Sequence, residues 1–223
     1  MNEDHNNAPS QMGNIVASLL KAPEHVAEAI ANRKDPLVAG VKLLCAAIVF
    51  HAVFGLAMGL FGGWQVAVMD VVKVPLVAVC SLLLCYPSLY VFACVGGTPL
   101  CLSQVFFLGA SCLAMTGLLL VGLAPVAWLF SISTANLPFV TMLALFIWIF
   151  AILFTVRYIE KLRAQALFQK SGGIRLWLLV LVVVTLQMVT CMRPILTTPK
   201  AGWWTGEKMF FLQHFGSTFD TQK

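Results

Sequence analysis

Five long apolar stretches, joined by short polar loops, are the feature that most constrains how this chain folds. They run over Val41–Gly63, Val66–Val95, Cys101–Phe130, Leu137–Val156 and Leu176–Ile195. A helix needs about 20 apolar residues to cross the hydrocarbon core of a bilayer, and each stretch reaches that length. Hydrophobic residues make up 60% of the 223-residue chain and charged residues only 10%. The sequence therefore predicts an all-α, polytopic membrane protein with five transmembrane helices.

The placement of basic residues predicts the orientation of these helices. Nine of the 14 Lys and Arg residues lie in two segments, one before or at the start of the first stretch and one between the fourth and fifth. They are Lys21, Arg33, Lys34, Lys42, Arg157, Lys161, Arg163, Lys170 and Arg175. The positive-inside rule then puts the N-terminus in the cytoplasm and the C-terminus outside. Because topology accounts for the net charge of +5, no nucleic-acid partner is expected.

Three regions follow from this pattern: a cytoplasmic amphipathic segment over residues 1–40, a five-helix transmembrane domain over 41–196, and an outer-face tail over 197–223. In the first region, Ile15, Val16, Leu19 and Leu20 form an apolar stripe at helical spacing. Such a helix either lies in the membrane interface or docks on a cytoplasmic partner. No signal peptide precedes the first stretch, which is expected to act as its own insertion signal.

The tail is rich in aromatic residues within a polar setting, with Trp203, Trp204, Phe210 and Phe211 as its main apolar side chains. Tryptophan is common at the membrane–water boundary, so the tail fits a helix half sunk among lipid headgroups. It fits equally well a lid over the bundle or a contact for a second protein, since exposed apolar patches often mark interfaces.

Three ionisable residues lie near the outer ends of the apolar stretches. Asp70 and Lys73 share one helix face, and Arg193 closes the fifth stretch. Charged groups inside a membrane usually face a partner or water. The three residues are therefore interpreted either as a structural network that ties the second helix to the fifth, or as a polar vestibule open to the outside.

His51 and Gln187 lie close to the membrane midplane in the first and fifth stretches. Each is expected to point into the bundle or across a helix contact, and His51 is interpreted either as a hydrogen-bonded core residue or as part of a proton relay. No chain of acidic residues continues toward the cytoplasm, so a complete proton path is not predicted.

Small residues and prolines indicate where helices pack closely or bend. Gly55 and Gly59 form a small-xxx-small motif that lets two helices approach, within one chain or between copies. Pro75 and Pro87 predict a bent or broken second helix, because proline frees a carbonyl inside the helix. Trp64 and Trp128 are assigned to the outer boundary of the membrane, and Tyr158 and Trp177 to the inner one.

The chain carries no motif typical of catalysis or metal binding. Its seven cysteines lie within or at the ends of the apolar stretches without a CxxC spacing, and no HExxH, GxSxG or Walker A sequence is present. We expect no cofactor, no metal and no enzymatic activity.

Five short motifs stand out along the chain: Val72–Leu76, Leu84–Tyr90, Leu102–Gln104, Ala124–Pro125 and Met192–Pro194. Together they resemble a family of bacterial five-helix membrane proteins that is broadly similar to Yip1-type proteins. Members of that family are sometimes labelled actin-binding WH2 proteins, but this chain has no LKKT-like actin-binding core. The resemblance implies a bacterial inner-membrane location and a membrane-organising role.

These observations predict a non-enzymatic membrane subunit or scaffold that forms a homo-oligomer or a complex with other membrane proteins in the lipid bilayer. The alternative is a small channel or transporter that uses His51, Asp70, Lys73 and Arg193.

Overall fold

The structure is a computed structural model that describes residues 36–95, 101–134, 137–162 and 173–191. All regular secondary structure in these ranges is helical, as predicted. The elements are α3 (Pro36–Gly59), η1 (Leu60–Gly62), α4 (Trp64–Val95), α5 (Leu102–Ser133), α6 (Leu137–Leu162) and α7 (Gly173–Cys191). The predicted N-terminal segment before residue 36 and the whole of the tail, with Trp203, Trp204, Phe210 and Phe211, lie outside the described residues.

Four of the helices are long and apolar enough to cross a membrane. The apolar spans cover Pro36–Gly62, Trp64–Phe92, Leu102–Ser133 and Phe139–Ile159. The first begins five residues before the predicted start at Val41. The apolar part of α7 over the described residues, Leu176–Met188, is shorter than a full span. The helices thus fit a multi-pass membrane protein, while the fifth span stays a prediction.

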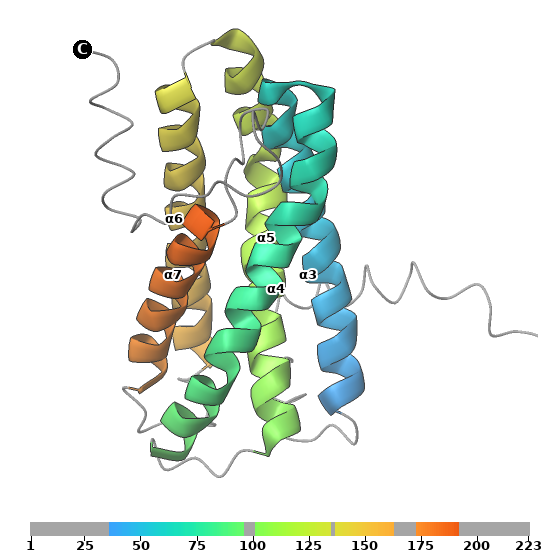
Figure 1. Ribbon diagram of the computed structural model, residues 1–223. Helices are drawn as coiled ribbons and strands as arrows, with labels where there is room; N and C mark the ends of the chain where they lie inside the picture. The colour runs from blue at the N-terminus through green and yellow to red at the C-terminus, as the bar shows by residue number, and fades with distance from the viewer. Residues whose placement is uncertain (1–35, 96–100, 135–136, 163–172, 192–223) are drawn as a thin grey trace, which may run out of the picture.

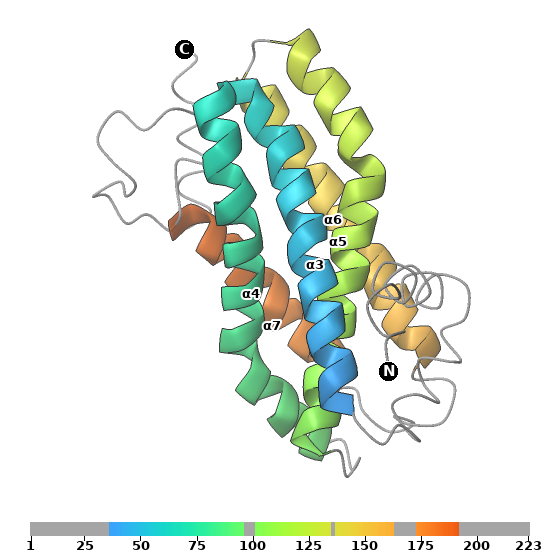
Figure 2. The same ribbon diagram turned by 90° about the vertical axis from the view of Figure 1, so that its right-hand side faces the viewer.

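Helices α3, α4 and α5 pack together as the centre of the bundle, with α6 against α5 and α7 against α4 (Figures 1 and 2). The turn between α3 and α4 is short because η1 leads directly into Gly63. Gly63 has a φ of 94°, a conformation that glycine adopts without steric cost, and its N–H donates to the Leu60 carbonyl at 3.2 Å. This turn reverses the chain and lays α4 along α3.

Glycines on α3 let α4 approach closely. A Cβ atom built on Gly59 would lie 2.5 Å from the Ala67 Cα, and one built on Gly55 would meet the Asp70 carbonyl oxygen. Real side chains do not tolerate such contacts, so only glycine fits at these two positions. The small-xxx-small motif therefore lies at a helix contact within one chain, the first of its two interpretations.

Buried apolar side chains form two clusters along the bundle. The first contains Leu43, Leu108 and Trp177 among others, and the second contains Phe54 and Ile147. On α3, α5 and α6 the break between the clusters coincides with one buried polar residue on each helix. These are His51, Thr116 and Thr155, which we call the polar layer.

Helix α4 is continuous through Pro75 and Pro87, so the predicted break does not occur. Beside the second proline, the Cys85 carbonyl accepts hydrogen bonds from the Ser88 hydroxyl at 2.7 Å and from the Trp177 indole N–H at 2.9 Å. The second bond joins α7 to α4. The carbonyl that Pro87 deprives of its helical donor is that of Leu83, four residues before it, so the bond from Trp177 is a helix-to-helix contact and not a replacement for the missing one.

This contact changes the interpretation of two aromatic residues. Trp177 and Tyr158 are buried in the bundle, whereas Trp64 and Trp128 are exposed. Tyr158 and Trp177, which the sequence assigned to the inner boundary, therefore pack against other helices. Their positions along the sequence did not indicate the direction in which the side chains point.

Candidate functional site

Asp70 lies on the side of α4 that faces α3, and its side chain is completely buried. It is held there by the two α3 glycines: a Cβ atom on Gly59 would come within 3.2 Å of the Asp70 Cβ, and Gly55 faces the Asp70 backbone. The close contact between α3 and α4 therefore buries the Asp70 carboxyl group between the two helices. An isolated charge costs several kcal/mol to bury, so this position needs compensation.

Neither carboxyl oxygen of Asp70 has a hydrogen-bond partner among the described residues. Lys73, one helical turn further along, is also buried, and its positive charge attracts the Asp70 carboxylate. Arg193, the second predicted partner, lies outside the described residues. The predicted network thus has two buried members close together, and its hydrogen bonds and its third member stay a prediction.

His51 is buried where α3 faces α5. Its Nδ1 lies 2.8 Å from the Ala47 carbonyl oxygen, so this nitrogen carries the hydrogen and donates it. A Cβ atom on Gly117 would lie 2.8 Å from the same nitrogen. The imidazole fits only because α5 has glycine there. These contacts fit the core interpretation of His51, and Gly117 is a partner that the sequence alone did not indicate.

The polar layer also joins α5 to α6. The Thr116 and Thr155 hydroxyls lie 2.9 Å apart, and each is also within hydrogen-bond distance of the carbonyl four residues before it, that of Cys112 or Ala151. One hydroxyl donates to the other, whose own proton goes to its helix carbonyl. This pair was not predicted, since threonines in apolar helices are common. Gln187 is half-buried on α7.

The buried polar groups of the described residues support few kinds of chemistry. Within the described ranges, no group of three His, Cys, Asp or Glu side chains is placed to hold a metal ion. Among the described residues, Asp70 is the one acidic residue with a buried side chain. The arrangement can hold a charge or a proton inside the bundle, and it offers no second acid for paired acid–base chemistry.

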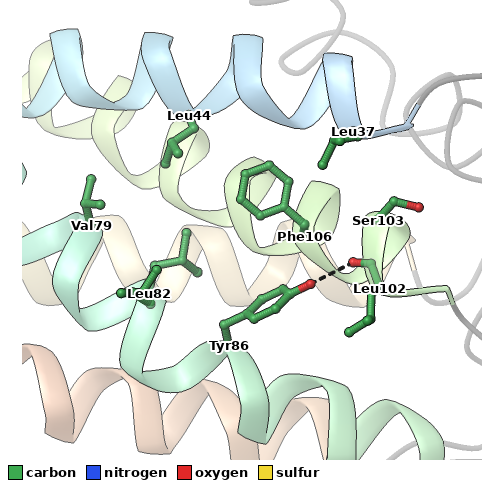
Figure 3. Close-up of a pocket in the computed structure, with 9 residues that line it drawn as sticks. Leu37, Leu44, Val79, Leu82, Tyr86, Leu102, Ser103 and Phe106 are labelled. Atoms are coloured by element: carbon green, nitrogen blue, oxygen red, sulfur yellow. Dashed lines mark hydrogen bonds between the residues drawn. The ribbon is translucent and has the colours of Figure 1, made fainter.

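A separate apolar groove lies between the start of α3, the C-terminal half of α4 and the start of α5 (Figure 3). Its volume is about 270 Å³. Nine residues line it: Leu37, Leu44, Val79, Leu82, Leu83, Tyr86, Leu102, Ser103 and Phe106. None of them was singled out as a binding residue from the sequence, because leucine and valine in an apolar helix carry no such signal.

No protein-family model, curated protein or solved structure matches this chain. The resemblance to Yip1-type proteins therefore stays a prediction. Two of the five motifs that carry it make structural contacts here: Cys85 accepts from Trp177, Tyr86 donates to the Leu102 carbonyl at 3.0 Å, and the Gln104 side chain accepts from the Cys101 N–H at 2.9 Å. These contacts fix helix ends and helix pairs.

Proposed function

We propose that this chain is a non-enzymatic integral membrane subunit or scaffold that assembles with copies of itself or with other membrane proteins. The observation that carries the proposal is the exposure of α6. Only 22% of its most apolar membrane window is buried, against 72% for α5. A helix with so little of its surface used inside the chain leaves most of that surface for external contacts.

The exposed face of α6 has a composition that favours protein contacts. Its large exposed side chains are Phe139, Met142, Phe146, Ile149, Phe150, Leu153 and Phe154. Their spacing of three and four residues follows one helix face, as in a helix that packs along another. The exposed faces of α3 and α4 carry mostly Val, Leu and Ile. Aromatic residues and Met are enriched at protein interfaces, which favours α6 as the assembly face.

Site-specific photo-crosslinking in native membranes tests this proposal. Benzoylphenylalanine is placed at Phe146, which is 71% exposed on α6, and in a matched variant at Val72, which is exposed on α4. We expect protein–protein adducts of higher mass from position 146 and only lipid adducts from position 72. Lipid adducts alone at both positions would refute assembly through α6.

The proposed orientation has a cytoplasmic N-terminus in a bacterial inner membrane and a fifth span that includes α7. A single cysteine near Thr205, in a cysteine-free background, should then react with an impermeant reagent in intact spheroplasts. Protection of that cysteine, together with labelling near Gln165, would invert the orientation.

A channel or transporter is a second candidate, favoured by the buried Asp70 carboxylate whose oxygens have no hydrogen-bond partner among the described residues. Buried acids in membrane helices often mark ion or proton paths. Purified protein in liposomes should then conduct ions or protons, and Asp70→Asn should abolish the flux. Unchanged flux in that variant, or no flux in the parent protein, would remove this candidate.

A further inference from the structure

We propose that the apolar groove between α3, α4 and α5 binds part of one acyl chain of an ester-linked phospholipid, with the Ser103 hydroxyl donating to the ester carbonyl at the end of the groove where α3 and α5 begin. This inference rests on the membrane-spanning helices and is independent of the assembly proposed for α6.

The groove has the direction that an acyl chain requires and a length that holds part of one. It extends from Leu37 to Leu44 on α3 and from Tyr86 to Val79 on α4, which is seven residue steps on each helix. At a rise of 1.5 Å per residue this corresponds to about 10 Å along the helix axis. Leu37 and Leu102 lie at the beginnings of their helices, so the groove starts at the end of the bundle and runs inward (Figure 3).

The walls of the groove are held in place by contacts within the chain. The Tyr86 hydroxyl donates to the Leu102 carbonyl at 3.0 Å, and the Tyr86 ring meets the Phe106 ring edge to face at 6.3 Å (Figure 3). The Phe106 ring in turn lies against Gly40, where a Cβ atom would come within 2.7 Å of it. The space is therefore formed before any ligand enters.

The mouth of the groove is continuous with the surface that faces the bilayer. Leu37, Leu83 and Leu102 line the groove and are also exposed, on spans long and apolar enough to cross the membrane. An engineered apolar cavity of about 150 Å³ in a soluble protein binds benzene, so a volume of about 270 Å³ that opens to hydrocarbon admits a larger apolar group. Since lipid tails are as apolar as leucine, binding depends on close packing in the groove and not on escape from water.

Ser103 supplies the polar end of the site. It lines the groove at the first turn of α5, is half-buried, and makes no hydrogen bond within the described part of the chain. In Figure 3 its hydroxyl points away from the Phe106 ring, toward the end of the bundle. A phospholipid carries its ester carbonyls between tail and headgroup, which is the depth of this hydroxyl when the tail occupies the groove.

Photo-labelling with a defined lipid tests the site. The full chain is reconstituted with phosphatidylglycerol that carries a diazirine in one acyl chain, illuminated and mapped by mass spectrometry. We expect adducts on the groove residues Leu82, Leu83 and Phe106 to exceed those on Phe146 of α6, which serves as the exposed control. Equal labelling of both regions would overturn the proposal. An absence of adducts in the groove would overturn it as well, because it would show that a protein segment closes the groove to lipid.

Two variants sharpen the test. Val79→Phe places a larger side chain inside the groove and should remove the groove adducts, whereas Val72→Phe, two turns away on the exposed surface of α4, should leave them unchanged. Ser103→Ala preserves the groove and should lower adducts from an ester-linked lipid by about threefold, the effect of one hydrogen bond, without changing those from an ether-linked lipid. Equal adducts from both lipids in the parent protein would remove the role of Ser103.

Discussion

The centre and the edge of this bundle are built in different ways. The backbones of α3 and α4 approach so closely that a Cβ atom on Gly55 or Gly59 would collide with α4, and a Cβ atom on Gly117 of α5 would collide with the His51 ring of α3. Helix α6 meets α5 through the Thr116–Thr155 hydrogen bond and leaves most of its apolar surface exposed. In a bilayer the hydrophobic effect does not hold helices together, so packing and buried hydrogen bonds decide which ones associate. The central three helices are therefore the most closely packed part of the described bundle, and the exposed surface of α6 is the one left for other contacts.

The largest effect on stability is expected at Asp70 and Lys73, the buried ionisable residues at the centre of the bundle. Asp70→Asn tests the predicted pairing of Asp70 with Lys73, both of which are buried: loss of one partner of a buried ion pair costs about 3–5 kcal/mol. Thermal unfolding in mild detergent should therefore show a clear fall in stability. The double variant Asp70→Asn with Lys73→Met should recover part of the loss. Strictly additive effects of the two changes would show that these charges do not interact.

A smaller effect, about 2 kcal/mol, is expected from Gly55→Ala. The added methyl group meets the Asp70 carbonyl oxygen, and α3 and α4 must separate to admit it. Gly122→Ala on α5 is the matched control because its Cβ atom meets nothing within 4 Å. Alanine is also the better helix former, so this control should be neutral or stabilising. Equal unfolding temperatures for the two variants would contradict the close contact described between α3 and α4.

The contact between α4 and α7 should contribute about 1–2 kcal/mol. Trp177→Phe removes the indole N–H that bonds the Cys85 carbonyl in a buried position. Trp128→Phe on the exposed surface of α5 is the control and should stay within about 0.5 kcal/mol of the parent protein. If the two variants unfold alike in detergent, α7 is not anchored through this bond.

The smallest effect on the isolated chain is expected at the edge. Phe146→Ala removes a side chain that is 71% exposed on α6, so the unfolding temperature in detergent should change little. The same change should reduce recovery of a larger complex from mild detergent, with Val72→Ala on the exposed face of α4 as control. A large loss of monomer stability would show that Phe146 is packed in the core, and would contradict the description of α6 as an exposed helix.

The positions of the helices were largely predictable from the sequence, because runs of apolar residues interrupted by Gly, Pro and polar groups set where helices begin and end. Helix α3 begins at Pro36 and not at Val41. Proline is common at the first position of a helix, and hydropathy alone does not detect this signal. Of the two alternatives predicted for the second helix, bent or broken, the break does not occur, because α4 continues through both prolines.

The site was predictable only in part. Asp70, Lys73 and His51 stand out because polar groups are rare in apolar stretches. Their partners do not stand out: Gly117 against His51, and Trp177 on the Cys85 carbonyl, are chemically ordinary residues distant in sequence. The groove is harder still, since its lining is made of residues that occur throughout every span.

Hydropathy and helix length are local properties of the chain, so they were enough to predict a membrane protein, the approximate positions of its helices and the charged residues within them. Which helix faces meet, which glycines are required and where a groove remains open became clear from the packed bundle. Those properties depend on the distance between side chains from different helices, and along an apolar helix every face satisfies the same hydropathy pattern.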